Sequence, residues 1–292
     1  MQVTQFADVA PRPRRVAVGE FDGVHLGHRT VIAGADTVLT FDPHPLSVVA
    51  PARAPRLITP LDIKAELVAS LGVSELVVIP FDAGWAARSP QAFIEQILVE
   101  RLRATHVSVG ENFRFGHDQR GDTAMLSGDE RFRTRVLRLV EVEGEIVSST
   151  HIRALIEAGE VDIAARFLGA PFQLRGEVVH GDKRGRELGF PTANLVPDES
   201  LVCPGHGVYV ARSGDACAAV NVGVRPTFGM GLSLLVEAFL LDTDADLYGT
   251  ELRLRFLTRL RGERRFDSAQ ELIAQMDEDV AQTRAWWAAH AG

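Results

Sequence analysis

The fold of the first half of the chain is decided by residues 15–28, which read Arg-Val-Ala-Val-Gly-Glu-Phe-Asp-Gly-Val-His-Leu-Gly-His. The apolar run 15–18 is typical of a buried strand, and a helix can begin beside the glycines that follow. A helix N-terminus presents unpaired N–H groups and the positive end of its dipole, so it favours phosphate. His25 and His28 would lie on one helix face and reach the same phosphate. The stretch predicts a nucleotide-phosphate site; the alternative is a turn with two surface histidines.

The composition is that of an acidic globular protein. Of its 292 residues, 46% are hydrophobic and 24% charged, and the formal net charge is −8. This charge argues against a nucleic-acid-binding protein, which would usually present a basic face. No apolar run is long enough to cross a bilayer, and the two cysteines are too few for a disulfide framework or a zinc cluster. We expect a cytoplasmic protein with small-molecule partners, no nucleic acid and no membrane, and leave a weak homo-oligomer open.

The first half alternates between two kinds of segment. Strand-like runs occur at 37–41, 75–79 and 105–109, and apolar residues recur at helical spacing over 61–71 and 90–103. This alternation predicts parallel βαβ units in a doubly wound, Rossmann-like α/β sheet. Ligands in such sheets bind beyond the carboxyl ends of the strands, where residues 19–28, 42–45 and 110–116 would lie.

The pattern changes near residue 170, after two short helical stretches at 151–158 and 161–168. Alternating runs follow at 173–179, 207–212, 216–222, 234–241 and 251–257, with Gly- and Pro-rich turns between them and a closing helix over about 268–290. Many short strands of this kind predict a small antiparallel β-barrel. We therefore expect two domains, residues 1–169 and 170–292.

Two further segments of the first domain carry side chains that suit phosphate. Asn112 lies in a glycine- and aromatic-rich loop, which could hold phosphate or stack on a flat ring, and which could equally be a plain surface loop. Ser149 and Thr150 stand at a predicted helix start with Arg153 in its first turn. Hydroxyls there serve as helix caps, or they bind phosphate beside the forked charge of the arginine.

The second domain opens with a loop suited to a polyphosphate. Gly181, Lys183 and Arg186 belong to a flexible cationic run, and Thr192 and Asn194 follow within Gly-Phe-Pro-Thr-Ala-Asn. Because Thr192 and Asn194 are two residues apart, they would share one side of a strand and could hold Mg²⁺ through hard oxygen atoms. A solvated basic turn would account for the cations alone, but not for the residues after them.

Glu237 is a carboxylate within the otherwise apolar run 234–241. Successive residues of a strand alternate between faces, so the side chain can simply point outward. If it points into the barrel mouth instead, it is well placed to act as a general base. The spacing leaves both readings open.

Taken together, these segments resemble the bacterial bifunctional riboflavin kinase/FAD synthetase family over nearly the whole chain. The motifs occur in the order of the family: 19–28, 41–45, 110–116, 148–153, 181–194, 220–229, 236–242 and 246–249. The resemblance implies a nucleotidyltransferase domain that moves AMP from ATP onto FMN, releasing pyrophosphate. It also implies a six-stranded flavokinase barrel that phosphorylates riboflavin with Mg²⁺–ATP.

Site roles follow from the same resemblance. It implies that His25 and His28 stabilise the α-phosphate in transfer, and that Glu237 takes the proton from the riboflavin 5′-hydroxyl. It assigns Mg²⁺–ATP of the kinase to Thr192 and Asn194. The nucleotide-binding residues that it implies are Gly19, Phe21, Asp22, Asn112, Ser149, Thr150, Arg153, Gly181, Lys183 and Arg186.

The chain departs from the family in its first crossover. Only residues 29–36 separate His28 from the next strand, where the family has a long helix. Eight helical residues span about 12 Å, so we expect at most two helical turns after His28, a more open adenylyl site, and FAD synthesis slower than FMN synthesis. The basic residue that the family tends to carry before Ser-Ser-Thr is also replaced, by Glu145-Ile146-Val147. The alternatives are a monofunctional riboflavin kinase and a non-catalytic flavin-binding regulatory protein.

Overall fold

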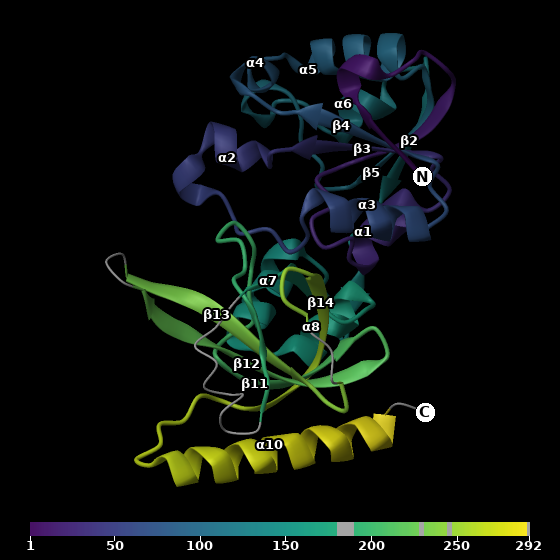
Figure 1. Cartoon of the computed structure of the whole chain (residues 1–292). Helices are drawn as coiled ribbons and strands as arrows, with labels where there is room; N and C mark the ends of the chain where they lie inside the picture. Colours follow the sequence, from purple (N-terminus) through teal and green to yellow (C-terminus); the bar gives the residue numbers. More distant parts are fainter. Residues whose placement is uncertain (180–189, 228–230, 244–246, 291–292) are drawn as a thin grey trace. The chain divides into compact units, whose positions relative to one another are not determined.

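The chain forms two compact units, Met1–Ser149 and Thr150–Gly292. Figure 1 shows a computed structural model, which describes residues 1–179, 190–227, 231–243 and 247–290. Cys203 and Cys217 are both buried, and no disulfide joins them.

The sequence predicts a domain boundary after residue 169, whereas the first compact unit ends at Ser149. Two helices lie between these positions. These are α7 (Ser149–Ala158) and α8 (Val161–Leu168), and Gly169 ends α8 in the left-handed conformation at φ 72°. Helix α8 packs against the barrel strand β14 (Glu251–Arg261), so by contacts it belongs with the second unit.

The first unit is built on a six-stranded sheet in which every pairing is parallel. The strand order is β1-β4-β3-β2-β5-β6. The strands are β1 (Gln2–Gln5), β2 (Arg14–Val18), β3 (Thr37–Asp42), β4 (Glu75–Pro80), β5 (Ala104–Gly110) and β6 (Arg133–Leu137). The four inner strands were predicted; the two edge strands were not. Edge strands pair on one side only and so keep polar side chains, as in Gln-Val-Thr-Gln of β1.

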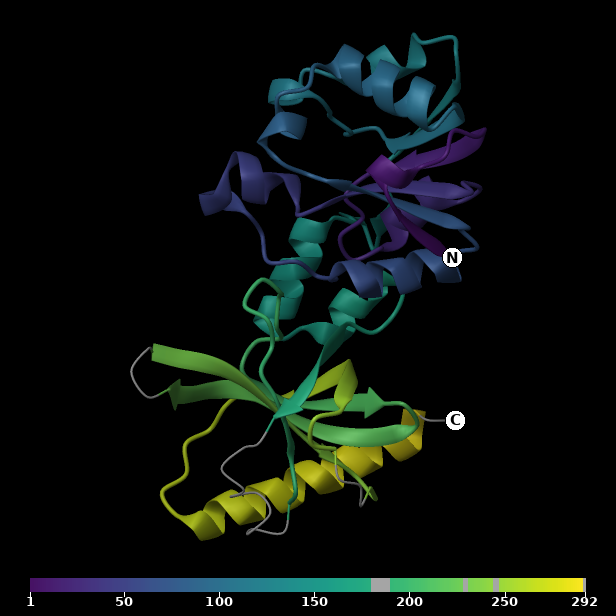
Figure 2. The same ribbon diagram turned by 45° about the horizontal axis from the view of Figure 1, so that its top comes forward.

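Helices cover both faces of this sheet, which confirms the doubly wound architecture (Figure 2). One face packs α1 (Leu26–Ile32) and α3 (Leu61–Ser70) onto a core that includes Ala17, Val38 and Leu76. The other packs the continuous helical segment of α5 (Pro90–Ala92) and η3 (Phe93–Arg101), with α6 (Thr123–Ser127), onto Val18, Leu39 and Val77. Neighbouring residues of a strand thus pack against the helix layers on opposite faces of the sheet.

Shorter elements complete the first unit. They are η1 (Phe6–Asp8), α2 (Pro45–Val49), η2 (Pro51–Arg53), α4 (Ala83–Ala86), η4 (His117–Gln119) and a two-stranded sheet of β7 (Glu141–Val142) and β8 (Glu145–Ile146).

The first crossover is as short as predicted. Helix α1 has seven residues, about two turns, and only four of them follow His28. Gly34, at φ 81°, turns the chain towards β3. Arg135 of β6 donates to the carbonyl oxygens of Thr30 (2.8 Å) and Ala33 (3.0 Å), and so caps the end of the shortened helix.

The second unit contains a closed barrel of six antiparallel strands, as predicted, in the order β10-β13-β12-β11-β14-β9. Besides β14, the strands are β9 (Gln173–Val179), β10 (Ala193–Leu195), β11 (Gly207–Ser213), β12 (Ala216–Thr227) and β13 (Gly231–Leu240). The closing helix α10 (Ala269–His290) lies along the outside of the barrel (Figure 2). Its Trp286 and Trp287 pack with Phe239 of β13 and Cys217 of β12.

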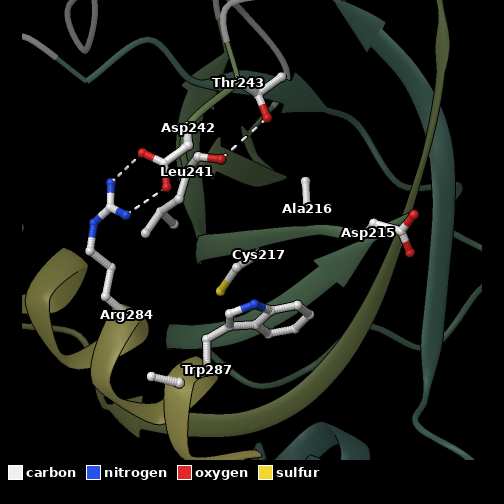
Figure 3. A pocket seen from close by; sticks show the side chains of 9 residues that line it. Asp215, Ala216, Cys217, Leu241, Asp242, Thr243, Arg284 and Trp287 are labelled. Atoms are coloured by element: carbon white, nitrogen blue, oxygen red, sulfur yellow. Dashed lines mark hydrogen bonds and ion pairs between the residues drawn. The ribbon is translucent and has the colours of Figure 1, made fainter. Parts of the chain in front are cut away.

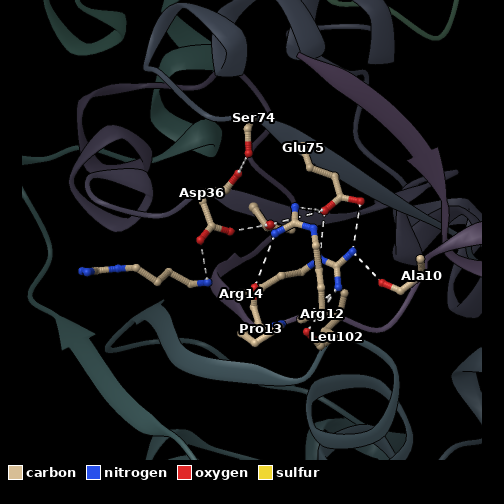
Figure 4. Close-up of polar contacts among 10 residues, drawn as sticks. Ala10, Arg12, Pro13, Arg14, Asp36, Ser74, Glu75 and Leu102 are labelled. Atoms are coloured by element: carbon tan, nitrogen blue, oxygen red, sulfur yellow. Dashed lines mark hydrogen bonds and ion pairs between the residues drawn. The ribbon is translucent and has the colours of Figure 1, made fainter.

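A buried ion pair joins the strands at the amino edge of the parallel sheet (Figure 4). Arg14 of β2 is 2% exposed and donates through Nε to Oε2 of Glu75 of β4 at 2.8 Å. Arg12 donates to the same oxygen at 2.7 Å, and Arg14 also donates to the carbonyl oxygens of Ala10 and Leu102. Burial alone would raise the pKa of Glu75, but the hydrogen bonds and charges of the two arginines outweigh it and lower that pKa.

We expect Glu75→Ala to lower the free energy of unfolding of the first unit by about 3–5 kcal/mol, because it leaves the Arg14 charge buried without its partner. Urea unfolding followed by circular dichroism measures this, with Glu95→Ala as control. Glu95 pairs with Arg131 at 2.6 Å on the surface, where such a pair contributes about 1 kcal/mol or less. Since the folded pKa of Glu75 is lowered, its contribution should be complete above about pH 4.5 and fall away below it. Equal losses in the two variants would contradict the role of burial.

Candidate functional sites

The phosphate motif begins at the point where the strand order of the parallel sheet reverses. Strand β2 has β3 on one side and β5 on the other, so residues 19–28 and 110–116 leave from adjacent strand ends. Crevices at such reversals are where doubly wound sheets bind ligands. The segment 42–45 after β3 leaves from the same edge. All three segments are therefore where the sequence predicts them.

The turn between β2 and α1 is held in an uncommon backbone conformation. Phe21 (φ 51°), Gly23 (φ 91°) and Val24 (φ 42°) all have positive φ. A side chain at Gly19 would meet the Phe21 ring at 3.0 Å, so that glycine makes room for a buried aromatic side chain. A strained turn of this kind persists only where many surrounding contacts hold its backbone in place, and such turns are typical of functional sites.

The two histidines lie together at the start of α1. His25 is the N-cap residue and its Nδ1 accepts a hydrogen bond from the backbone N–H of His28 at 3.2 Å. The rings stack, with centroids 3.5 Å apart and planes at 17°. Because Nδ1 of His25 is an acceptor, the proton of the neutral ring must be on Nε2. The turn thus holds His25 ready to donate from Nε2.

Both imidazoles are uncharged near neutral pH. Burial lowers the pKa of His25 to about 4. Burial, and then the neighbouring His25 and Lys64, lower the pKa of His28 well below its usual value. Within the described part of the chain, Nδ1 of His28 is buried and has no hydrogen-bond partner. A pair of neutral rings can donate hydrogen bonds to a phosphate without the desolvation cost of a buried charge.

Asp22 and Ser149 brace this turn from within the first unit. The carboxylate Oδ1 of Asp22, 2% exposed, accepts from the backbone N–H groups of Ile58 (2.9 Å) and Thr59 (3.0 Å). The Ser149 hydroxyl donates to the Asp22 carbonyl oxygen at 2.9 Å. Neither arrangement was predictable from spacing, since the partners are 36 and 127 residues apart.

The remaining predicted residues of this half lie on two elements. Asn112 is exposed in the loop after β5. The aromatic residues around it are part of the core rather than a platform for a flat ring: Phe115 is 6% exposed and its ring centroid is 5.1 Å from that of Phe93. Thr150 and Arg153 lie in the first turns of α7, directly after Ser149.

In the barrel, Glu237 lies at the centre of a row of three polar residues. In the strand register, Asn194 of β10 and Asn221 of β12 are its direct neighbours on either side. The Asn221 Nδ2 donates to Glu237 Oε2 at 3.3 Å. Asn221 was not among the predicted site residues, although the sequence offers a signal: it is an amide in the apolar run Ala218–Val222.

The row lies on the outer face of the barrel. Val236 and Ala238, on either side of Glu237, are fully buried in the barrel interior, so Glu237 points outward. Of the two orientations left open by the sequence, the structure has the outward one. The carboxylate is nonetheless half-buried, and Asn194 beside it is 6% exposed.

Thr192 and Asn194 provide hard oxygen donors next to this carboxylate. Thr192 precedes β10, and its carbonyl oxygen accepts from Asn194 Nδ2 at 3.4 Å. Among the described residues, no group of three or more His, Cys, Asp or Glu could hold a metal ion. The hydroxyl, amide and carboxylate oxygens do suit Mg²⁺ that is bound chiefly through nucleotide phosphates. Gly181, Lys183 and Arg186 lie outside the described residues.

A pocket of about 370 Å³ opens on the same outer face (Figure 3). Strand ends and α10 line it with Asp215, Ala216, Cys217, Leu241, Asp242, Thr243, Arg284, Trp287 and Ala288. One wall has the indole of Trp287, and Arg284 forms a two-pronged ion pair with Asp242 at 2.6 and 2.7 Å. Leu241 is four residues beyond Glu237, about 13 Å along the strand direction.

Comparison with known proteins gives a family for each half of the chain. The FAD synthetase family model matches residues 8–151 and the riboflavin kinase model matches residues 168–287. Bifunctional riboflavin kinase/FMN adenylyltransferases are similar over nearly the whole chain. That of Listeria monocytogenes is 37% identical, covering 94% of this chain and 92% of its own, and that of Bacillus subtilis is 36% identical, covering 90% and 89%. That of Escherichia coli K12 is 36% identical, covering 93% and 92%.

A solved structure has the same two-part fold. It is a crystal structure of a protein named as a macrolide-efflux protein from Streptococcus pneumoniae, with a TM-score of 0.89 and 30% identity, covering 98% of this chain and all of that one. In the part of this chain that the structure describes, no helix is long and apolar enough to span a bilayer. On its sequence and its fold, the chain belongs to the bifunctional riboflavin kinase/FMN adenylyltransferase family.

Proposed function

We propose that this chain phosphorylates riboflavin to FMN with Mg²⁺–ATP and then adenylylates FMN to FAD, releasing pyrophosphate. The observation that carries the proposal is that one chain holds two unlike arrangements of polar side chains: stacked histidines at a strand-order reversal, and a carboxylate between two asparagines on a barrel. We assign adenylyl transfer to residues 1–169 and the kinase reaction to residues 170–292.

In the kinase reaction, Glu237 accepts the proton of the riboflavin 5′-hydroxyl as that oxygen attacks the γ-phosphorus of ATP and the bond to the β-phosphate oxygen breaks. Asn221 holds the carboxylate in place through its amide. Thr192 and Asn194 would hold the Mg²⁺ of the nucleotide, which supplies charge neutralisation when bound. Gly181, Lys183 and Arg186 would enclose the polyphosphate. Positioning and charge neutralisation provide most of the catalysis in such transfers.

We place the flavin ring in the pocket beside α10. The indole of Trp287 offers a flat apolar wall, and the pocket lies on the same face of β13 as Glu237. A ring bound there would direct its ribityl chain along β13 towards the carboxylate.

In adenylyl transfer, an FMN phosphate oxygen attacks the α-phosphorus of ATP, and pyrophosphate leaves as the α–β bond breaks. His25, which donates from Nε2, and His28 would stabilise the charge that develops on the α-phosphate. Asn112, Ser149, Thr150 and Arg153 would bind the other phosphates. Gly19, Phe21 and Asp22 shape the turn that the nucleotide contacts.

The cellular setting belongs to the proposal as well. The net charge of −8 argues against binding to nucleic acid. We expect a cytoplasmic enzyme that associates with further copies weakly if at all. Size-exclusion chromatography with light scattering would measure that association.

One assay separates the bifunctional enzyme from its alternatives. With riboflavin and Mg²⁺–ATP, we expect FMN to appear first and accumulate before FAD. Helix α1 has only seven residues, and we expect so short a helix to leave the adenylyl site more open. Products are separated by chromatography over time. FMN alone, with no FAD at any enzyme concentration, would indicate a monofunctional kinase. Tight flavin binding without either product would indicate a regulatory protein, and conversion to FAD without FMN build-up would contradict the rate order.

A further inference from the structure

The chain uses lysine almost nowhere. Of its 31 basic side chains only two are lysines, Lys64 and Lys183; all others are arginines. Lys183 belongs to the predicted polyphosphate loop, whereas Lys64 lies in α3 and has no role in the two reactions as proposed above. Lysine provides a compact point charge, whereas arginine provides a wide planar fork, so the two are not interchangeable in a buried site.

Lys64 is buried beneath the phosphate motif. It is 6% exposed, and its Nζ donates to the carbonyl oxygen of Glu20 at 2.7 Å and to the Thr40 hydroxyl at 3.4 Å. Glu20 directly follows Gly19 in the turn between β2 and α1, and Thr40 belongs to β3. The ammonium group therefore links the helix layer to the turn that carries the histidines.

The groups that act on Lys64 electrostatically all belong to the carboxyl edge of the sheet. They are Glu20 and Asp22 after β2, and Asp42 at the end of β3. Lys64 also acts on the histidine pair: His25 and Lys64 both lower the pKa of His28. Burial lowers the pKa of Lys64, whereas the three carboxyl groups oppose that shift. Burial raises the pKa of Glu20, and the charge of Lys64 opposes that shift. The buried ammonium group is stabilised by these carboxyl groups and by its hydrogen bonds to the Glu20 carbonyl oxygen and the Thr40 hydroxyl.

We propose that Lys64 is a positioning residue for adenylyl transfer: it fixes the His25–His28 turn through the Glu20 carbonyl and provides a fixed positive charge behind the imidazoles, facing the ATP phosphates. The inference rests on the function proposed for the histidine pair. Burial and the neighbouring His25 lower the pKa of His28, and the charge of Lys64 lowers it further, so that the rings meet the α-phosphate as hydrogen-bond donors and the positive charge stays behind them.

The test compares Lys64→Met with Glu66→Met, which introduces the same side chain on the exposed face of α3. We expect Lys64→Met to lower kcat for FAD synthesis from supplied FMN at least tenfold and to leave FMN synthesis from riboflavin unchanged. Glu66→Met should change neither rate by more than twofold. Lys64→Arg should stay at least fivefold slow, because the guanidinium group does not fit the space of the ammonium group.

The pH profile separates positioning from mere stability. Removing the positive charge raises the pKa of His28 from its lowered value, so the acid limb of FAD synthesis should move to higher pH in Lys64→Met. A purely structural defect would lower the rate equally at every pH. FAD synthesis within twofold of wild type in a folded Lys64→Met, or an unmoved acid limb, would overturn the proposal.

Selective ¹³C-lysine labelling of the wild-type chain keeps the inference testable if Lys64→Met does not fold. The spectrum contains two lysine spin systems, and Lys183→Met identifies the one that remains as Lys64. We expect the Lys64 ε-signal to titrate below the ordinary value of about 10.4 and to move on addition of Mg²⁺ and pyrophosphate. An ordinary pKa for Lys64, together with an ε-signal whose chemical shift does not change on addition of pyrophosphate, would overturn the proposal. If His28→Ala also leaves FAD synthesis intact, the result contradicts the function proposed for the histidine pair and not only the role of Lys64.

Discussion

Glu237→Gln is expected to lower the rate of FMN formation from riboflavin by about 10²–10⁴-fold, the usual effect of removing a general base. The glutamine oxygen can still accept the hydrogen bond from Asn221, whose Nδ2 lies 3.3 Å from the native carboxylate. The substitution therefore preserves the shape and the local contacts of the outer barrel face and removes only the capacity to take a proton. A coupled assay that detects ADP or FMN measures the rate.

The design has an internal and an external control. FAD synthesis from supplied FMN should be nearly unchanged in Glu237→Gln, because that reaction uses the histidine pair of the first unit. Glu177→Gln removes a carboxylate from β9 of the same barrel, where it is exposed, and should leave both reactions at wild-type rates. Kinase activity of Glu237→Gln within tenfold of wild type would show that another group takes the proton.

The extent to which the sequence predicted the fold follows from burial. Inner strands such as β4, whose first five residues are all buried, have continuous apolar runs and were predicted. The edge strands β1 and β6 pair on one side only and alternate too weakly to be recognised. The barrel was predicted because its strands alternate strongly: Val220 and Val222 are fully buried while Asn221 between them is not.

The sites were predictable where a motif is local and not where it is assembled from distant residues. The capping of α1 by His25 and the position of His28 three residues later follow from spacing within ten residues. The link between Lys64 and Glu20 spans 44 positions, and the pairing of Asn221 with Glu237 depends on strand register. A local sequence pattern predicts neither contact, because the whole fold determines strand register and the packing of helices on sheets.

The direction of Glu237 illustrates the same limit. Alternation fixes only that Glu237 and its neighbours Val236 and Ala238 face opposite sides. The closure of the sheet into a barrel decides which side becomes the interior. Here β10 pairs with β9 to close the barrel, and the carboxylate faces outward. Helix α10 covers part of that outer side. As a general base, Glu237 would therefore be accessible to a flavin that stays outside the barrel core, which is filled by side chains.

His28→Ala should have the opposite specificity to Glu237→Gln. It removes one of two stacked imidazoles at the start of α1, and the loss of one donor to a developing negative charge costs about 10²–10³ in rate. FMN formation should be unaffected, and His106→Ala, on β5 outside the site, should leave both reactions unchanged.

The pH dependence follows from the lowered pKa values of both histidines. Because burial brings the pKa of His25 to about 4 and that of His28 well below its usual value, neither ring gains a proton between about pH 8 and 6, and wild-type FAD synthesis should show no histidine limb there. Protonation of His25 should appear only as the pH falls towards 4. The rate of pyrophosphate release from supplied FMN and ATP measures both effects. Activity of His28→Ala within tenfold of wild type, or a wild-type limb near pH 6.5, would mean that these imidazoles do not meet the α-phosphate as neutral donors.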